Sequence, residues 1–402
     1  MRFKYSATTP QGKIENGVID ARSSEEAAEQ IRGTGMLVVS LRRDAGRGFA
    51  DLLGVGWVPN VTKVTFAKHM SLMIKAGLPI DEAVRVLADQ AQGPFRRALA
   101  GVLQAVEGGR QLSEGFAQYP KIFTELFTAT VRAGESSGTL EQSLDDLAVQ
   151  LSKSYELERK IRGAMIYPVI VLVAAAGIGV GLSLFVLPRI ISLFDSITVE
   201  LPFATRVLIG FSNFMVAHGP IAIVIFVAAV FALVQLMGSR PVRPFSHALL
   251  LRLPIFGKLV QNYNLALFAR TTGTMLKSGL PIGDAFEIAS NTLRNASYKR
   301  ALMKVRKGVE TGIPATTVLD RFPRLFPSIT TRMLAVGERS GKFEETFRYL
   351  AEFYEDEVDT STKNLSTVLE PILLIIIGLT VAYIAIAIIS PIYNLIGSIE
   401  RL

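Results

Sequence analysis

The sequence predicts an all-α integral membrane protein: a duplicated six-helix cytoplasmic bundle with three transmembrane helices, plus a small N-terminal α/β module. Two observations predict this fold class. Three runs contain no charged side chain, and they cover residues 163–188, 207–239 and 371–399. Each run holds an apolar core of roughly 20 residues, enough for a helix to cross about 30 Å of hydrocarbon. The charged segments that precede the first and the third run repeat each other.

The N-terminal residues have the alternating pattern of strands rather than the pattern of helices. We expect a small α/β module over residues 1–43 and a glycine-containing linker over residues 44–61. The expected elements of the module are strands over 3–7, 14–20 and 36–41, a turn at Gln11-Gly12, and a helix that Ser23 and Glu26 cap and that ends at Ile31.

The two charged segments match motif by motif. Gly77-Leu78-Pro79 matches Gly279-Leu280-Pro281 at a spacing of 202 residues. After one inserted residue, Gly134-Glu135-Ser136-Ser137-Gly138 matches Gly337-Glu338-Arg339-Ser340-Gly341 at a spacing of 203. Duplication explains this agreement. The sequence therefore predicts two cytoplasmic helical domains, over 62–162 and 240–367, with further matches of Phe66 to Phe268, Phe123 to Phe326, Lys160 to Lys363 and Pro168 to Pro371.

Within a repeat, apolar residues recur at intervals of three and four, which indicates amphipathic helices. Glycine and proline breaks divide each repeat into about six of them. The last helix of the first repeat begins at Thr139, where Gln142 would complete a capping box. No strong breaker follows before Leu187, so this helix would be roughly 73 Å long at 1.5 Å per residue and would enter the bilayer. Pro168 and Pro371 would kink the two equivalent helices at the same depth.

Charge placement predicts the orientation of the membrane spans. The three spans are expected at 163–188, 219–239 and 368–392. All of the net charge of +8 lies in the two large charged segments, and basic residues crowd their membrane flanks. Positive flanks favour the cytoplasm, so both helical domains and the N-terminus are expected there. A loop with a short helix over 189–218 and a tail over 393–402 would lie outside.

Several classes of chemistry lack the residues that they need. There is no cysteine, and three histidines, His69, His218 and His247, are scattered and read as structural. No P-loop pattern occurs, and the spans carry no charge for a proton relay and no aspartate pair for proteolysis. Basic residues alternate with acidic ones, which argues against nucleic acid binding. We expect no enzyme, no cofactor and no metal site.

Two groups of glutamates leave alternatives open. The Gly-Glu-x-Ser-Gly motifs read as turns between helices, with an interface or ion-binding role for Glu135 and Glu338 as the alternative. Glu370, where the third span begins, would either reach the headgroup layer or contact a partner. A transporter or channel would need polar residues in the spans, and the candidates are Ser183, Gln235, Thr380 and Tyr383.

The duplicated Gly-Leu-Pro-Ile and Gly-Glu-x-Ser-Gly motifs, together with Tyr167-Pro168, Glu370-Pro371 and Ser390-Pro391-Ile392-Tyr393, resemble the type II secretion system F family. Residues 3–7 and 17–21 resemble that family's N-terminal module, so the resemblance covers nearly the whole chain.

The resemblance implies a non-enzymatic platform protein of the bacterial inner membrane. Such a protein couples a hexameric cytoplasmic ATPase to the assembly of pilin or pseudopilin subunits into a fibre. The implied partners are that ATPase, the subunits, other inner-membrane assembly components, the lipid bilayer and further copies of the chain. We expect residues of the paired motifs to set domain geometry and contacts, and four others to act where helices enter the membrane; the latter are Tyr167, Pro168, Glu370 and Pro371. We also expect Glu338→Ala to lower assembly more than it lowers the protein level.

Overall fold

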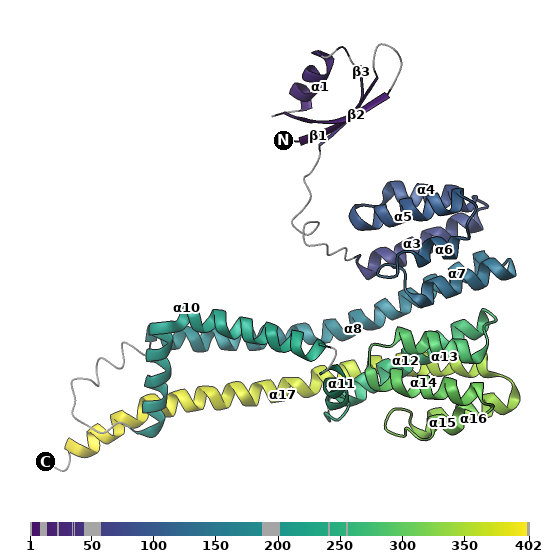
Figure 1. The fold of residues 1–402 in the computed structure, drawn as a ribbon. Coiled ribbons are helices and arrows are strands. Elements are labelled where there is room, and N and C mark those ends of the chain that lie inside the picture. The colour runs from purple at the N-terminus through teal and green to yellow at the C-terminus, as the bar shows by residue number, and fades with distance from the viewer. Residues whose placement is uncertain are drawn as a thin grey trace. The chain divides into compact units, whose positions relative to one another are not determined.

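A computed structural model describes most of the chain (Figure 1). The described residues are 2–8, 14–21, 24–33, 35, 37–43, 58–186, 202–239, 242–254 and 256–399. Several sequence-based expectations fall outside them: the turn at Gln11-Gly12, the cap at Ser23, most of the linker over 44–61, the start of the loop over 189–218, and the last three residues of the tail.

The N-terminal residues form a three-stranded antiparallel sheet with one helix. The strands pair in the order β2-β1-β3, so the first strand in sequence lies in the centre. A register shift interrupts the β1–β3 pairing between Ser6 and Ala7. That the segment folds as a separate module stays a prediction. The elements are β1 (Arg2–Thr8), β2 (Ile14–Asp20), α1 (Ser24–Gly33) and β3 (Leu37–Arg43).

The first helical domain contains six helices in the described residues, as the breaker pattern predicted. The predicted capping box at its last helix is wrong, because the Thr139 hydroxyl pairs with that of Ser137 at 2.6 Å and Gln142 donates to Asp146. Thr139 instead closes the preceding turn through its backbone N–H, which donates to the Gly134 carbonyl. The helices are α3 (Asn60–Lys75), α4 (Ile80–Gln90), α5 (Gly93–Glu107), α6 (Leu112–Ala117), α7 (Glu125–Ser137) and α8 (Leu140–Gly181).

The second helical domain repeats this arrangement after one additional helix, α11. Its helices begin at the residues that correspond to those of the first domain at the spacing of 202 or 203, except that α12 begins earlier. The helix ends correspond as well, except that α15 ends one residue earlier and α17 continues to Ile399. The helices are α11 (Arg243–Leu250), α12 (Phe256–Lys277), α13 (Ile282–Thr292), α14 (Ala296–Glu310), α15 (Ala315–Leu319), α16 (Ser328–Ser340) and α17 (Phe343–Ile399).

Both domains are built around an aromatic core, but most of the rings that surround the central phenylalanine lie on different helices in the two domains. Phe66 and its repeat partner Phe268 are both buried at the centre. In the first domain Phe66 packs with Phe116, Phe123 and Phe127, which follow it on α6, the next loop and α7. In the second domain the rings around Phe268 come from α13, the loop before α16, and α17, namely Phe286, Phe326 and Phe347. The duplicated fold thus fills the same space with different residues.

Helices α8 and α17 each run from a helical domain into an apolar segment (Figure 1). They are the two single helices of the described residues that are long and apolar enough to cross a membrane, and the bent helix α10 would make a third. The helix continues through Pro168 in α8 and through Pro371 in α17, so neither proline ends its helix. After α8, a π-helical turn η1 covers Leu182–Val186. Most of the expected external tail is helical, because α17 ends only at Ile399.

Helix α10 (Phe203–Gly238) bends by 92° between residues 219 and 224. Gly219-Pro220 lies at the bend, where proline lacks the N–H for the helical hydrogen bond and clashes with the preceding turn. The part before the bend is the short helix expected ahead of the second span. It packs on the far end of α17, where the Thr205 hydroxyl donates to the Ala387 carbonyl at 2.6 Å and Leu208 packs near Ala387.

Candidate functional site at the junction of the helical domains

The glutamates of the two Gly-Glu-x-Ser-Gly motifs cap a short helix within their own domain. Glu135 accepts hydrogen bonds from the backbone N–H groups of Leu112 and Ser113, at 2.5 and 3.0 Å. These are the first N–H groups of α6, which have no partner inside the helix. A carboxylate is well suited to them because it also complements the positive end of the helix dipole.

Glu338 makes the same contacts in the second domain. It accepts hydrogen bonds from the backbone N–H groups of Ala315 and Thr316, at 2.7 and 3.4 Å, and from the Thr316 hydroxyl at 2.5 Å. Both motifs therefore tie the end of one helix to the start of a short helix 23 residues earlier. The structure shows an intramolecular role for Glu135 and Glu338, and an ion-binding or partner-binding role stays a prediction.

The glycines of these motifs have two different tasks, so their interpretation as one turn is only half right. Gly138 and Gly341 end α7 and α16 with φ of 73° and 70°, a left-handed conformation that favours glycine. Gly134 and Gly337 lie inside the helix instead. A Cβ on Gly134 would stand 2.7 Å from the Cβ of Ser143, and one on Gly337 2.9 Å from the Cβ of Thr346. These glycines let the next long helix pack closely.

The paired Gly-Leu-Pro motifs form identical links between helices. Gly77 and Gly279 have φ of 83° and 79°, and the following Leu78 and Leu280 donate their N–H to carbonyls five residues earlier. This is the Schellman arrangement, which satisfies carbonyls at a helix end. Pro79 and Pro281 directly precede α4 and α13, and Pro281 is the N-cap of α13.

The two helical domains contact each other through polar pairs that the sequence analysis did not single out. The Gln150 side chain of α8 donates to the Thr271 hydroxyl at 3.1 Å and accepts from that of Thr274 at 3.3 Å. Gln150 and Thr271 are buried, so both need these partners. Two exposed pairs flank them: Lys277 Nζ lies 2.8 Å from Asp146 Oδ1, and Asn291 donates to Glu125 at 2.8 Å.

An apolar cluster completes this junction. Leu126 of α7 is 3% exposed and packs with Met275, Ala285 and Ile288 of α12 and α13. At about 25 cal/mol per Å², burial of a leucine side chain of this kind contributes roughly 2 kcal/mol. The junction therefore combines a buried hydrogen-bonded pair with an apolar contact, which makes its geometry specific.

Four charged residues join the long helices just before their apolar segments. Lys160 lies 3.3 Å from Glu156 on its own helix and 3.1 Å from Asp359 of α17, and Asp359 lies 2.7 Å from Lys363. A hydrogen bond to Asp359 raises the pKa of Lys160, and hydrogen bonds from Lys363 and Lys160 lower the pKa of Asp359. The repeat partners Lys160 and Lys363 thus share one carboxylate. Since the group is solvent-accessible, it contributes orientation more than stability.

The four residues expected to act where helices enter the membrane lie in different surroundings. Pro168 is buried, whereas Tyr167 is half exposed. Glu370 and Pro371 lie on the exposed surface of α17. The structure does not bring these four residues together in a single site, and a contact of Glu370 with a partner stays a prediction.

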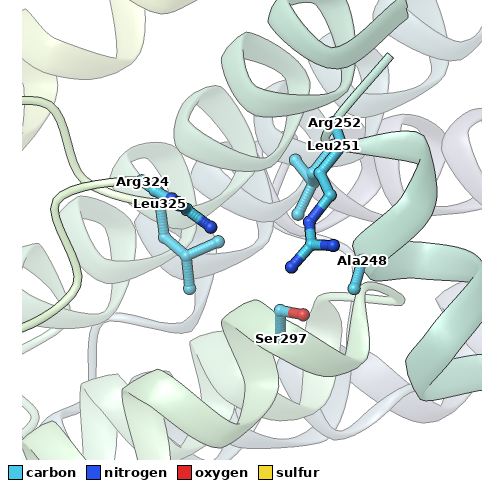
Figure 2. A pocket seen from close by; sticks show the side chains of 6 residues that line it. All are labelled: Ala248, Leu251, Arg252, Ser297, Arg324 and Leu325. Carbon is cyan, nitrogen blue, oxygen red and sulfur yellow. The ribbon is translucent and has the colours of Figure 1, made fainter.

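A pocket of about 730 Å³ opens in the second domain (Figure 2). The guanidinium groups of Arg252 and Arg324 point into it, opposite Ser297 at the start of α14. Two arginines and one serine do not form an acid–base pair or a nucleophile–base pair. Among the described residues, no group of three His, Asp or Glu side chains could hold a metal ion.

Models of two known protein domains match the chain. The model of the type II secretion system protein F matches residues 66–188 and, a second time, residues 268–391. The model of that protein's N-terminal domain matches residues 1–42. The chain belongs to the type II secretion system protein F family. The two matches confirm the duplication and the resemblance predicted from the paired motifs.

Curated members of the protein F family match over nearly the whole chain. The type IV pilus assembly protein PilC of Thermus thermophilus is 32% identical over 99% of both chains. The type II secretion system protein F of Pseudomonas aeruginosa is 30% identical over 98% of both chains, and that of Vibrio cholerae is 28% identical over 99% of both. The apolar helices fit a membrane protein, as membership in this family implies.

The cap that Glu338 provides predicts a loss of stability. Glu338→Ala leaves the first N–H groups of α15 without a partner, so we expect it to lower the free energy of unfolding by about 1–2 kcal/mol. Glu338→Gln, which keeps an acceptor, should lose less. Thermal unfolding of the detergent-solubilised chain measures both, with exposed Glu344→Ala as the control. Because Glu338 caps α15, protein level and assembly should fall together, contrary to the expectation from the sequence. Lower assembly at an unchanged protein level would favour the interface alternative.

His247 predicts a pH dependence of the second domain. Its Nδ1 accepts a hydrogen bond from the Ala296 N–H at 3.1 Å, which only the neutral imidazole can do. Burial, and secondly the charge of Arg243, lowers the pKa of His247 below the ordinary value of 6.5. The unfolded chain therefore takes up this proton first. The stabilisation is present above pH 6.5 and is lost as the pH falls through the folded-state pKa.

We expect the melting temperature of the wild-type chain to fall between pH 7.5 and 5.5, and that of His247→Asn to fall less. Asparagine keeps an acceptor but does not titrate. Circular dichroism of the detergent-solubilised chain at each pH measures the difference, and equal pH slopes for the two chains would contradict the role of His247.

Proposed function

We propose that the chain is an inner-membrane platform protein on which a cytoplasmic ATPase acts to assemble pilin or pseudopilin subunits. Relatives at about 30% identity are named as a type IV pilus assembly protein and as a type II secretion system protein. Both names describe machines that the same family serves, and the whole-chain coverage supports transfer of that general role. The proposed role needs no catalytic residue in this chain.

One observation supports the coupling role above all others: α8 and α17 are each continuous from a helical domain into an apolar segment. A continuous helix has no hinge at which displacement of the domain would be lost. Lys160 and Asp359 further join the two helices before the apolar segments begin. A force applied to the helical domains would therefore reach the spans directly.

The proposed topology follows from the charge pattern. Three spans, over 163–188, 219–239 and 368–392, would leave both helical domains and the N-terminus in the cytoplasm and the C-terminus outside. The second of these spans corresponds to the part of α10 after its bend. The domain boundaries at 1–43, 62–162 and 240–367 belong to the same proposal.

A transporter or channel is the competing function, and two of the four polar residues named for it have other contacts. The Thr380 hydroxyl donates to the Ile376 carbonyl of its own helix at 2.8 Å. The Tyr383 hydroxyl donates to the Ala204 carbonyl of α10 at 3.2 Å. Gln235 lies on the exposed surface of α10. Two of the four polar groups are therefore satisfied by backbone carbonyls, and the side chain of Ser183 lies outside the described residues.

Deletion and affinity purification in the source organism test the proposal. A deletion strain should lose fibre assembly or secretion and regain it with the full chain. A tagged full chain, cross-linked in membranes, should co-purify a hexameric ATPase and a pilin or pseudopilin, above an equally tagged multi-pass membrane protein as the control. Recovery of neither partner, together with normal fibres and secretion in the deletion strain, would overturn the proposal.

The junction offers a further test of the mechanism, because the chain has no native cysteine. Asp146→Cys with Lys277→Cys would lock the two helical domains where they are joined by an ion pair. Loss of assembly on oxidation and recovery on reduction would indicate that the domains move relative to each other. Undiminished assembly by the oxidised chain would exclude such movement from the mechanism.

A further inference from the structure

The junction between the helical domains joins two unlike faces. The first domain contributes a face of α7 and α8, which contains Glu125, Leu126, Asp146 and Gln150. The second contributes a face of α12 and α13, which contains Thr271, Thr274, Met275, Lys277, Ile288 and Asn291. Because each domain is a copy of the other, each also possesses the face that its neighbour uses. One copy of each face therefore remains outside the junction.

The remaining faces are exposed at the positions that the junction buries. On the second domain, the α16–α17 face contains Ile329 and Phe353. Ile329 is 52% exposed, whereas its counterpart Leu126 is 3% exposed. Phe353 is 37% exposed, whereas its counterpart Gln150 is 1% exposed. Tyr349 corresponds to Asp146 and is also exposed. These are large apolar and aromatic side chains at a surface.

The α3–α4 face of the first domain shows the same contrast. Leu72 corresponds to Thr274 and is 64% exposed. His69, which corresponds to the fully buried Thr271, is exposed as well. Met73 and Val86, at the positions of the buried Met275 and Ile288, are only partly buried. Both free faces therefore have the accessibility of surfaces that lack their partner.

The residues of the two free faces also complement each other in the register of the junction. The partly buried contact of Gln150 with Thr274 corresponds to Phe353 and Leu72, so both of its polar side chains are replaced by apolar ones. Thr271, the buried partner of Gln150, corresponds to His69. The apolar contact of Leu126 with Met275 and Ile288 also has a counterpart. Its counterpart would join Ile329 to Met73 and Val86, so this contact stays apolar on both sides.

The charged pairs follow the same rule. The ion pair Asp146–Lys277 corresponds to Tyr349 and Lys75, where the ammonium group can lie over the aromatic ring. The pair Glu125–Asn291 corresponds to Ser328 and Asp89, where a hydroxyl can donate to a carboxylate. These four contacts of the junction thus have compatible counterparts in the free faces, while Arg332 takes the position of Ala129.

We propose that the α3–α4 face of one chain docks on the α16–α17 face of a second copy, in the arrangement that already joins the two domains within a chain. The contact is head-to-tail, so it would build a closed ring or an open row rather than a two-fold dimer. α8 and α17 leave their domains in the same direction (Figure 1), so repetition of the same arrangement keeps the spans of each added chain in one bilayer.

Cysteine cross-linking of the full chain in membranes tests the contact, since no native cysteine interferes. Leu72→Cys with Phe353→Cys in one chain should give a ladder of dimers and larger oligomers on oxidation, seen on a non-reducing gel. Each single variant alone should give no cross-link, and co-expression of the two single variants should give dimers only. Both side chains are exposed, so neither substitution removes core packing.

Two control pairs of cysteines provide a positive and a negative control for this experiment. Gln150→Cys with Thr274→Cys should close within one chain, and Leu72→Cys with Arg300→Cys, an exposed position on α14, should not cross-link. Self-cross-linking of either single variant would indicate a two-fold contact and overturn the proposal. Two other outcomes would also overturn the proposal: a chain that stays monomeric while the intrachain control pair forms its disulfide, and a product in which the chain is cross-linked to a different protein.

A second variant measures the same contact without oxidation. Phe353→Asp would bury a carboxylate against Leu72, so we expect the apparent Kd for self-association to rise about tenfold or more. An unchanged Kd would contradict the proposed face. None of these readouts involves fibre assembly, so failure of this inference leaves the proposed function standing.

Discussion

Replacing Leu126 by aspartate should separate the two helical domains while each keeps its own core. The leucine is almost completely buried against Met275, Ala285 and Ile288. A carboxylate there would lose its hydration without gaining a basic partner, which costs about 3–5 kcal/mol. We expect the oxidative cross-link between Asp146→Cys and Lys277→Cys to be lost in the Leu126→Asp background, as seen on a non-reducing gel.

The duplication supplies a matched control for this change. Ile329 occupies the corresponding position in the second domain and is half exposed, so Ile329→Asp should leave the intrachain cross-link intact. If Ile329→Asp separated the domains equally, the effect would come from general destabilisation rather than from the junction. The same control should weaken association between copies, because Ile329 lies on the α16–α17 face.

Replacing Phe268 by alanine should unfold the second helical domain more readily than any surface change. Its ring centroid lies 5.4 to 6.0 Å from those of Phe286, Phe326 and Phe347, and the side chain is fully buried. Truncation of a buried phenylalanine costs about 3–5 kcal/mol, because transfer energy is lost and a cavity remains. Urea unfolding of the detergent-solubilised chain, followed by circular dichroism, measures the loss.

Phe245→Ala provides the comparison for Phe268→Ala. Phe245 lies on α11 of the same domain but is 71% exposed, so its truncation should change the free energy of unfolding by less than about 0.5 kcal/mol. Phe66→Ala, at the repeat position of Phe268, should destabilise the first domain by a similar amount to Phe268→Ala. A small effect at both buried positions would mean that the aromatic cores relax around the cavities.

Features that depend on local sequence were predictable. The break at Gly77-Leu78-Pro79 needs only a left-handed glycine and a proline, both visible in the sequence. The six helices of the first domain follow from breaks of that kind. One local feature was predicted wrongly: the capping box at Thr139 does not form, because the preceding turn already engages its backbone N–H and Ser137 engages its hydroxyl.

Features that depend on contacts between distant residues were not predictable from one sequence. Glu135 reads equally well as a turn residue or an interface residue until the start of α6 is seen beside it. Gln150 and Thr271 carry no motif, although they form the buried polar contact between the domains. The one available signal was that Gln150 and its repeat partner Phe353 differ in polarity within otherwise matching helices.

The sequence by itself determined the apolar segments, the duplication and the helical breaks, because hydrophobic length, repeat spacing and backbone preference are properties of consecutive residues. Only the tertiary structure decided which copy of each face is buried. Leu126 and Ile329 occupy equivalent positions on equivalent helices, yet one is buried and the other is not. Burial depends on what the rest of the chain places against a face. With two domains in the chain, the α7–α8 face packs against the α12–α13 face, and the repeat counterparts of these two faces stay uncovered.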